Sequence, residues 1–136
     1  MNNAAQILDP FVEQWAVLLT TYKRDGTPVG TAVNIVVEGD HAYFRTWDTA
    51  WKLKRIRNNP EVEVAPCTPR GRPTGPTVRA HARVLEGSES ARAGRLLARK
   101  YPFSHGVMVP LVHRQRGNTT MYLELRPVED VSRDRA

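Results

Sequence analysis

Cysteine, long apolar segments and glycine-rich phosphate motifs are nearly or wholly missing from this sequence of 136 residues. Cys67 is the only cysteine, which excludes an internal disulfide and a thiolate-rich zinc site, and we expect it to be a small buried side chain rather than a reactive thiol. The sequence contains no run of about 18 apolar residues, which is the length needed to span a membrane. Neither Gly-x-Gly-x-x-Gly nor Gly-Lys-Ser/Thr occurs, so neither a Rossmann dinucleotide site nor an NTPase is predicted.

Secretory and metal-binding signals are missing as well. The first residues contain no basic region followed by an apolar one, so we expect no secretory signal and a cytoplasmic location. The four histidines are scattered without the spacing of metal ligands, and we therefore expect no metal.

Aromatic residues number only ten, and no stacking platform is recognisable. A small basic barrel with interspersed aromatic side chains could track the backbone of a single-stranded nucleic acid. The scarcity of aromatic residues disfavours that alternative, and we expect neither a nucleic-acid partner nor a membrane partner.

Positive charge is what the sequence has in excess. Twenty Lys and Arg residues against fourteen Asp and Glu residues give a formal net charge of +6 at pH 7. Such a surplus admits anionic partners such as nucleic acid, an acidic membrane or a phosphorylated small molecule. Charge alone does not distinguish these partners from an ordinary solvated basic surface, so the positions of the cations must decide.

Short β-rich segments separated by turn signals make up most of the chain. Asp25-Gly26 and Gly39-Asp40 are typical of tight turns between antiparallel strands, and apolar-polar alternation indicates half-buried strands. We predict a helix over residues 89–100, whereas residues 107–113 are ambiguous. The six predicted strands lie at residues 16–22, 28–37, 41–46, 61–65, 77–85 and 119–125.

These elements predict one mainly β domain with peripheral α-helices. The domain spans residues 1–136, with its core at about 15–127 and a flexible tail at 128–136. Hairpins and short connections favour an antiparallel sheet that closes into a barrel.

A short helix with concentrated positive charge is predicted directly after the third strand. Asp48 or Thr49 could cap its start, and the Asn-Pro pair at 59–60 ends it, because the residue before a proline is pushed out of helical conformation. The first turn of such a helix offers free N–H groups and a positive dipole end to an anion, and Lys52 and Arg55 would add charge beside it.

Three neighbouring side chains extend this phosphate-site hypothesis. Thr46 could donate its hydroxyl, while Trp47 and Trp51 could cover a planar ring or its linker. Cations toward the end of a helix are favoured in any case, and the tryptophans could belong to the core. The residues alone therefore leave both a phosphate site and an ordinary basic surface open.

Three segments resemble the pyridoxamine-phosphate-oxidase-like split β-barrel flavoproteins and, within them, the F420-dependent branch (flavin/deazaflavin oxidoreductases, B group). The segments are LLTTYKRDGTPVGTAVNIV, GDHAYFRTWDTAWKLKRIRNNPEVEVAPC and RGRPTGPTVRAHARVLEG, and the match runs from about Trp15 to Pro127. Its most specific parts are DGTP, the helix ending Lys-x-x-Arg-x-x-Asn-Pro, and APCTPRGRPTGP. The resemblance implies a six-stranded antiparallel split β-barrel similar to FMN-binding proteins, assembled as a homodimer with two cofactor sites at its interface.

The resemblance also implies which residues bind the cofactor. Lys52 matches the basic residue that holds the cofactor phosphate, Thr46 matches a hydroxyl residue at the end of the preceding strand, and Arg55 matches a helix position that reaches the cofactor tail in some relatives. Residues 76–79 would approach from the other subunit. The complete implied set is Thr31, Ala32, Val33 and Asn34 along the ring, with Thr46, Trp47, Trp51, Lys52, Arg55, Pro76 and Arg79.

Departures from the family pattern favour F420 over FMN. The FMN-dependent oxidases place basic residues where this sequence has Thr31, Val36 and Trp51, which weakens an FMN-type phosphate grip. Coenzyme F420 is a deazaflavin with a phosphodiester and an acidic oligoglutamate tail, and it would use the surplus of positive charge. The cations expected to meet it are Lys52, Lys54, Arg55, Arg70 and Arg72.

The resulting hypothesis is an F420-dependent oxidoreductase that transfers a hydride from reduced F420 to an unidentified small electrophilic substrate. In such enzymes the cofactor carries the chemistry, while the protein orients the ring and excludes water. No catalytic residue is nominated, and Tyr101, His105 and solvent are candidate proton donors. The alternatives are an FMN-binding pyridoxamine-phosphate-oxidase-like protein and a non-catalytic binder of a flavin or a haem-related ligand.

Overall fold

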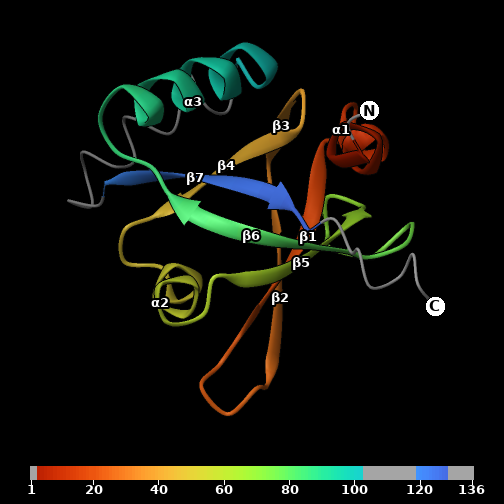
Figure 1. Ribbon diagram of the computed structural model, residues 1–136, viewed down its shortest axis with the longest axis vertical. Coiled ribbons are helices and arrows are strands. Elements are labelled where there is room, and N and C mark those ends of the chain that lie inside the picture. Colours follow the sequence, from red (N-terminus) through yellow and green to blue (C-terminus); the bar gives the residue numbers. More distant parts are fainter. Residues whose placement is uncertain (1–2, 103–118, 129–136) are drawn as a thin grey trace.

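The computed structural model describes residues 3–102 and 119–128. Within them, seven strands form one antiparallel sheet in the order β2-β1-β5-β6-β7-β4-β3 (Figure 1). The strands are β1 (Ala16–Tyr22), β2 (Pro28–Val33), β3 (Ile35–Glu38), β4 (His41–Trp47), β5 (Glu61–Cys67), β6 (Val78–Val84) and β7 (Thr120–Pro127). The helices are α1 (Asn3–Leu8), the 3-10 helix η1 (Asp9–Phe11), α2 (Trp51–Asn58) and α3 (Gly87–Lys100).

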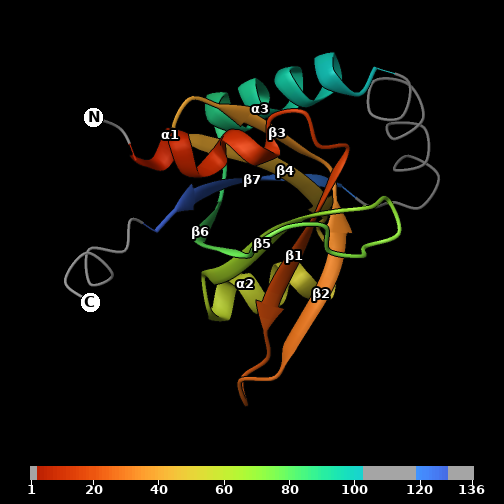
Figure 2. The ribbon, with the colours of Figure 1, turned by 90° about the vertical axis from the view of Figure 1, so that its right-hand side faces the viewer.

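The sheet curls because its two edge strands are consecutive in the chain. Strand β2 pairs with β1, β3 pairs with β4, and only Asn34 separates β2 from β3. The chain therefore passes from one edge of the sheet to the other at a single residue, and the sheet takes the form of a half-barrel (Figure 2). This mainly β, antiparallel architecture is consistent with the predicted split barrel.

The number of strands differs from the prediction. One strand over residues 28–37 is expected, but the structure divides it at Asn34, so six strands is wrong and seven are present. Asn34 stands outside both ladders, and its side-chain Nδ2 donates a hydrogen bond of 3.0 Å to the carbonyl of Trp15. This bond ties the break between β2 and β3 to the residue that precedes β1. The other five predicted strands agree with the structure within two residues at each end.

An N-terminal helical segment was not predicted. Helix α1 and the 3-10 helix η1 contribute Leu8 and Phe11, each only 1% exposed, to the main core. Ala4, Leu8 and Phe11 recur at helical spacing, which is a signal that the sequence does contain.

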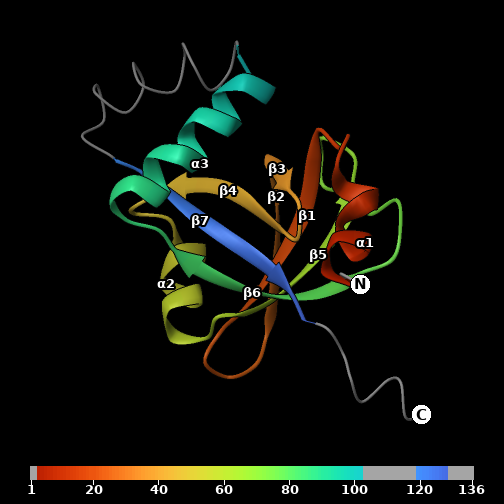
Figure 3. The same cartoon turned by 45° about the horizontal axis from the view of Figure 1, so that its top comes forward.

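Alternation along β4 divides the apolar side chains between two cores. Ala42 and Phe44 face the interior of the curled sheet, where α2 adds Leu53 and Ile56. Tyr43 belongs instead to a second cluster, between the sheet and α3, which lies across β7 and β4 (Figure 3). The other buried members of that cluster are Leu85, Ala93, Leu97 and Tyr101.

Helix α2 starts differently from the prediction. Its N-cap is Ala50 and no side chain caps it, so the expected cap at Asp48 or Thr49 is wrong. Asp48 instead ties β4 to β7: its N–H donates to the Thr119 carbonyl at 2.9 Å, and its Oδ1 accepts from the Thr119 N–H at 3.4 Å. The helix ends at Asn58, before the Asn-Pro pair, as predicted.

Two predicted segments fall outside the described ranges. These are the ambiguous residues 107–113 and the tail, of which only Val128 is described. In the described part of the chain, no helix has the length and apolar character needed to cross a membrane.

Candidate functional site

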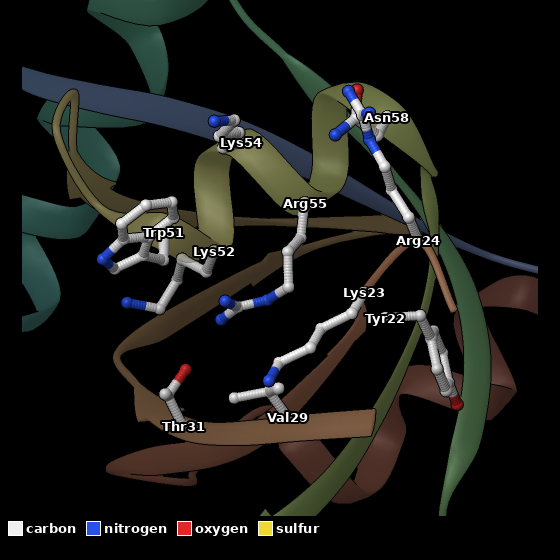
Figure 4. A pocket seen from close by; sticks show the side chains of 10 residues that line it. All are labelled: Tyr22, Lys23, Arg24, Val29, Thr31, Trp51, Lys52, Lys54, Arg55 and Asn58. Carbon is white, nitrogen blue, oxygen red and sulfur yellow. The ribbon is translucent and has the colours of Figure 1, made fainter. Parts of the chain in front are cut away.

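A cleft of about 730 Å³ lies between α2 and the β1–β2 hairpin (Figure 4). Its floor and rim include Val29 and Thr31 of β2 and Trp51 of α2. Half of its ten lining residues are cations and none is a carboxylate; we call it the basic cleft. The five cations are Lys23, Arg24, Lys52, Lys54 and Arg55.

Lys52 is partly buried at one end of the basic cleft. Its Nζ lies 3.5 Å from Oγ1 of Thr46, a side chain at the end of β4 whose residue is only 8% exposed. Burial, and secondarily the nearby charge of Arg55, lowers the pKa of Lys52 below its ordinary value. In the described residues no carboxylate forms an ion pair with it. An anion at this position would offset the cost of desolvating the ammonium group.

Arg55 is held by one hydrogen bond and points into the cleft. Its Nε donates to Oγ1 of Thr21 at 2.6 Å, and Thr21 is buried, with 1% exposure. This bond uses one N–H of the guanidinium, and Figure 4 shows the group directed toward the space between Lys52 and Lys23. The remaining N–H groups could serve an anion.

Lys23 and Arg24 reach the cleft through the turn between β1 and β2. The Lys23 N–H donates to the Thr27 carbonyl at 2.9 Å, and the Gly26 N–H donates to the Lys23 carbonyl at 2.9 Å. Gly26 adopts a φ of 91°, which a residue with a side chain rarely tolerates. The turn therefore sets both cations opposite α2.

Trp51 forms an exposed wall of the cleft. The residue is 70% exposed, and Nζ of Lys54 lies 5.3 Å from the centroid of its ring, within the range of a cation–π contact. A large exposed indole beside cations offers a flat apolar surface to a planar group.

A second hollow of about 310 Å³ adjoins the basic cleft and shares Lys52 with it; we call it the small pocket. It adds one cation, Arg45, whose Nη2 donates to Oδ1 of Asn34 at 3.1 Å. Its lining is Ala32, Val33, Asn34, Arg45, Thr46, Trp47, Lys52 and Thr120.

Nine of the eleven predicted cofactor-binding residues line one or both of these hollows. Thr31, Trp51 and Arg55 line the basic cleft, Lys52 lines both, and the others line the small pocket. Pro76 and Arg79 line neither. Arg79 borders a hollow of about 110 Å³ on β5 and β6, and the contribution of these two residues to a partner's site stays a prediction.

Arg70 and Arg72, expected to meet the acidic tail, lie in a separate place. They line a hollow of about 700 Å³ formed by residues 68–72, where the Thr68 N–H donates to the Arg72 carbonyl at 2.9 Å and Oγ1 of Thr68 accepts from the Arg72 N–H at 3.1 Å. Within the described chain, neither arginine lines the basic cleft.

Three cations of the site were not predicted. Lys23 and Arg24 directly precede the Asp25-Gly26 turn, which belongs to the same β1–β2 hairpin as Thr31. Arg45 stands two residues before Trp47 in a strand, so period-two alternation places both on one face, and this signal was available.

Tyr101, one of the candidate proton donors, lines neither hollow. The hydroxyl of Tyr101 lies 2.7 Å from the Trp15 carbonyl and 3.0 Å from the Ile35 carbonyl, to either of which it can donate, and burial raises its pKa. Tyr101 therefore ties α3 to the strands. His105 lies outside the described residues. In the part of the chain that the structure describes, no three His, Cys, Asp or Glu residues are grouped so as to hold a metal ion.

Comparison with known proteins identifies both a family and a fold. A family model described as pyridoxamine 5'-phosphate oxidase matches residues 5–128. A proposed pyridoxamine 5'-phosphate oxidase from Listeria innocua is 16% identical, with 93% of this chain and 94% of that chain covered and a TM-score of 0.65. The haem storage protein HutZ from Vibrio cholerae is 17% identical, with 90% and 91% covered and a TM-score of 0.64. An F420 reductase is 18% identical, with 88% and 92% covered and a TM-score of 0.55.

At these identities the solved structures show a shared fold. No curated protein matches the sequence.

Proposed function

The chain belongs to the pyridoxamine 5'-phosphate oxidase family, and we propose that it is an oxidoreductase that binds coenzyme F420 and transfers a hydride from the reduced coenzyme to a small electrophilic substrate. The observation that carries this proposal is the basic cleft, in which five cations gather around about 730 Å³ without a lining carboxylate. Clefts lined by one sign of charge concentrate ligands of the opposite sign.

The extent of the charge supports a long polyanion. A terminal phosphate such as that of FMN would meet Lys52 and Arg55, whereas a phosphodiester followed by several carboxylates would also use the other three cations. In this proposal Lys52 and Arg55 hold the phosphodiester, and the acidic tail runs toward Lys23, Arg24 and Lys54. This replaces the expected role of Arg70 and Arg72, which line another hollow.

The ring would lie along the segment Thr31–Asn34, which runs from the basic cleft into the small pocket. Its side chains are small or short, so a planar ring can approach the backbone. Trp51 would limit the access of water on the helix side. When bound, the deazaflavin supplies a hydride from its ring carbon, and the substrate takes up this hydride together with a proton from solvent.

We also propose that the protein is a homodimer with both cofactor sites at its interface. Two large apolar side chains, Trp15 and Trp51, are 52% and 70% exposed in the single chain, and aromatic residues are enriched in protein interfaces. Pro76 and Arg79 would then reach the partner's site. Sedimentation equilibrium is expected to give twice the chain mass of 15.3 kDa, and the mass of a monomer would contradict this assembly.

Parallel titrations of the purified protein with F420 and with FMN test the cofactor. We expect dissociation constants on the order of micromolar for F420, about 8 kcal/mol of binding free energy, and weaker binding of FMN, followed by fluorescence. Tight FMN binding with no F420 binding would assign the protein to the flavin-dependent members, and binding of neither would reject the proposal. An additional titration with haemin tests the alternative of a carrier for a haem-related ligand.

A further inference from the structure

We infer that Thr21 is a positioning residue of the basic cleft: its buried hydroxyl fixes the direction in which Arg55 presents its guanidinium to an anion. Thr21 lines neither the basic cleft nor the small pocket, and it was not among the predicted site residues. The identity of the anion rests on the proposed function, whereas the fixing of Arg55 rests on the contact between the two side chains.

Thr21 occupies a position in β1 that otherwise suits an apolar side chain. Alternation along the strand places it on the same face as Val17 and Leu19, which are fully buried in the main core. Thr21 itself is only 1% exposed, and buried polar side chains normally have a hydrogen-bond partner. Valine has nearly the same shape and needs no partner, so packing alone does not explain the hydroxyl.

The guanidinium of Arg55 is the partner of this hydroxyl. Nε of Arg55 donates to Oγ1 of Thr21 at 2.6 Å, which is short for a bond of this type. Helix α2 packs against β1, and its Leu53 and Ile56 are buried in the main core, so the backbone that carries Arg55 is fixed as well. Both ends of the Arg55 side chain are therefore held before a ligand arrives.

The bond to Thr21 decides which edge of the guanidinium remains for a ligand. A planar guanidinium can hold two oxygens at its side, through Nε and one Nη, or at its end, through Nη1 and Nη2. Because Nε is occupied, the end is the fork that remains. The group is directed toward the space between Lys52 and Lys23 (Figure 4), so an anion held by those lysines would meet this end.

Fixing the guanidinium in advance favours binding, because less side-chain freedom is lost when the ligand arrives. Lys52 and Arg55 line the same cleft, and their like charges repel each other. Among the described residues no carboxylate pairs with Arg55. The hydroxyl of Thr21 is thus what holds the guanidinium against this repulsion.

Thr21→Val tests the inference, with Thr20→Val as its matched control. Thr21→Val keeps the shape of the side chain and removes the acceptor, whereas Thr20→Val makes the same change on the opposite face of β1. Titrations with F420 and with inorganic pyrophosphate measure the affinities. We expect Thr21→Val to weaken binding of both anions by roughly three- to tenfold, and Thr21→Ser to stay within about twofold of wild type. Thr20→Val should leave both affinities unchanged.

A double-mutant cycle separates positioning from a merely structural role. If Thr21 acts through Arg55, Thr21→Val should weaken binding in the wild-type background and have no further effect in Arg55→Ala. A hydroxyl that only supports the fold would act equally in both backgrounds, and its loss would lower the free energy of unfolding. We expect urea unfolding of Thr21→Val to show no such loss, because a methyl group replaces a buried hydroxyl and the partly buried Arg55 stays in contact with water.

A measurement on the wild-type protein covers the case that Thr21→Val does not fold. The Nε–H of Arg55 should exchange with water more slowly than that of Arg95, which is exposed on α3, because it is bonded to a buried oxygen. NMR of the arginine side-chain signals gives both rates without a ligand, and equal rates would overturn the inference.

The outcomes separate this inference from the proposed function. F420 binding that is unchanged in Thr21→Val, or that falls equally with and without Arg55, would overturn the positioning role and leave the cofactor proposal standing. Thr21-dependent binding of pyrophosphate by a protein that does not bind F420 would support the positioning role and reject the cofactor proposal. Binding of neither anion would reject both.

Discussion

Three cations near α3 are paired with carboxylates, whereas in the described residues none of the five cations of the basic cleft is. In the α3 region Arg83 contacts Glu89 at 3.0 Å and Glu124 at 3.3 Å, and Arg126 contacts Glu124 at 3.1 Å. Arg92 of α3 pairs with Glu38 of β3. These ion pairs join α3 and the strands β3, β6 and β7; we call Glu38, Arg83, Glu89, Arg92, Glu124 and Arg126 the paired network.

The basic cleft gathers cations from two elements without such compensation. Lys23 and Arg24 come from the hairpin, and Lys52, Lys54 and Arg55 come from α2. In residues 3–102 and 119–128, none of them forms an ion pair with a carboxylate. Like charges held close together oppose folding, and an anion in the cleft, as we propose, would relieve this repulsion. Charge in the paired network therefore serves the fold, whereas charge in the cleft has no carboxylate partner among the described residues.

Lys52→Ala should have the largest effect and act on binding alone. Loss of a charge-assisted contact to the phosphodiester should weaken F420 binding by about 1.5–3 kcal/mol, or roughly ten- to hundredfold. The free energy of unfolding should not fall, because the substitution removes a partly buried cation beside Arg55. Fluorescence titration and urea unfolding measure the two quantities. Arg95→Ala is the charge-matched control, and equal affinities of both variants would show that Lys52 is ordinary surface.

Glu124→Ala should show the opposite behaviour. Glu124 is 5% exposed and accepts from both Arg83 and Arg126, whose side chains are about half exposed and stay solvated when it is lost. We expect the free energy of unfolding to fall by about 1–2 kcal/mol and F420 affinity to stay unchanged. Glu89→Ala, at the exposed end of the network, should have a smaller effect on unfolding. A loss of F420 affinity in Glu124→Ala would contradict the separation between a paired network that stabilises the fold and a basic cleft that binds the ligand.

Acid should weaken the paired network through Glu38. The hydrogen bond from Arg92 holds the pKa of Glu38 below its ordinary value of 4.5, so the stabilisation is present above that value and is lost as pH falls through the lower, folded pKa. Because the side chain is 27% exposed, we expect a contribution of about 0.5–1 kcal/mol. Urea unfolding of wild type and Glu38→Gln from pH 6 downward measures it. The variant should lose less stability than wild type, and equal losses would contradict this role.

Lys54→Ala should have the smallest effect on F420 affinity, and it tests how far the ligand-binding part of the cleft extends. Lys54 is exposed at the rim, so its loss should cost about 0.2–0.5 kcal/mol of F420 binding, or roughly twofold. Arg70→Ala, in the separate hollow, should cost nothing measurable. If Arg70→Ala weakened F420 binding more than Lys54→Ala in the same titration, the acidic tail would be assigned to the loop of residues 68–72 instead of the basic cleft.

Much of the fold was predictable because its signals are local. Alternation and turns located the strands, and the Asn-Pro pair located the end of α2. The break at Asn34 depends on Trp15 and Arg45, which are distant in sequence, so no local pattern marks it. The cap of α2 was mispredicted for the same reason, since Asp48 is drawn to Thr119.

Site residues were predictable where they lie on a single helix or strand, or where the family resemblance covers them. Lys52 and Arg55 share a helix and were expected together. Lys23 and Arg24 join them only through the packing of a hairpin against α2, which a linear pattern does not display. Arg70 was expected at the acidic tail because of its charge, and charge does not determine which hollow a loop residue lines.

A crystal structure of the protein with F420 would show where the phosphodiester binds. We expect a phosphodiester oxygen about 2.7–3.1 Å from Nζ of Lys52, with the ring along Thr31–Asn34 and the tail toward Lys23 and Arg24. A phosphodiester bound at Arg70 and Arg72, with solvent in the basic cleft, would contradict this expectation.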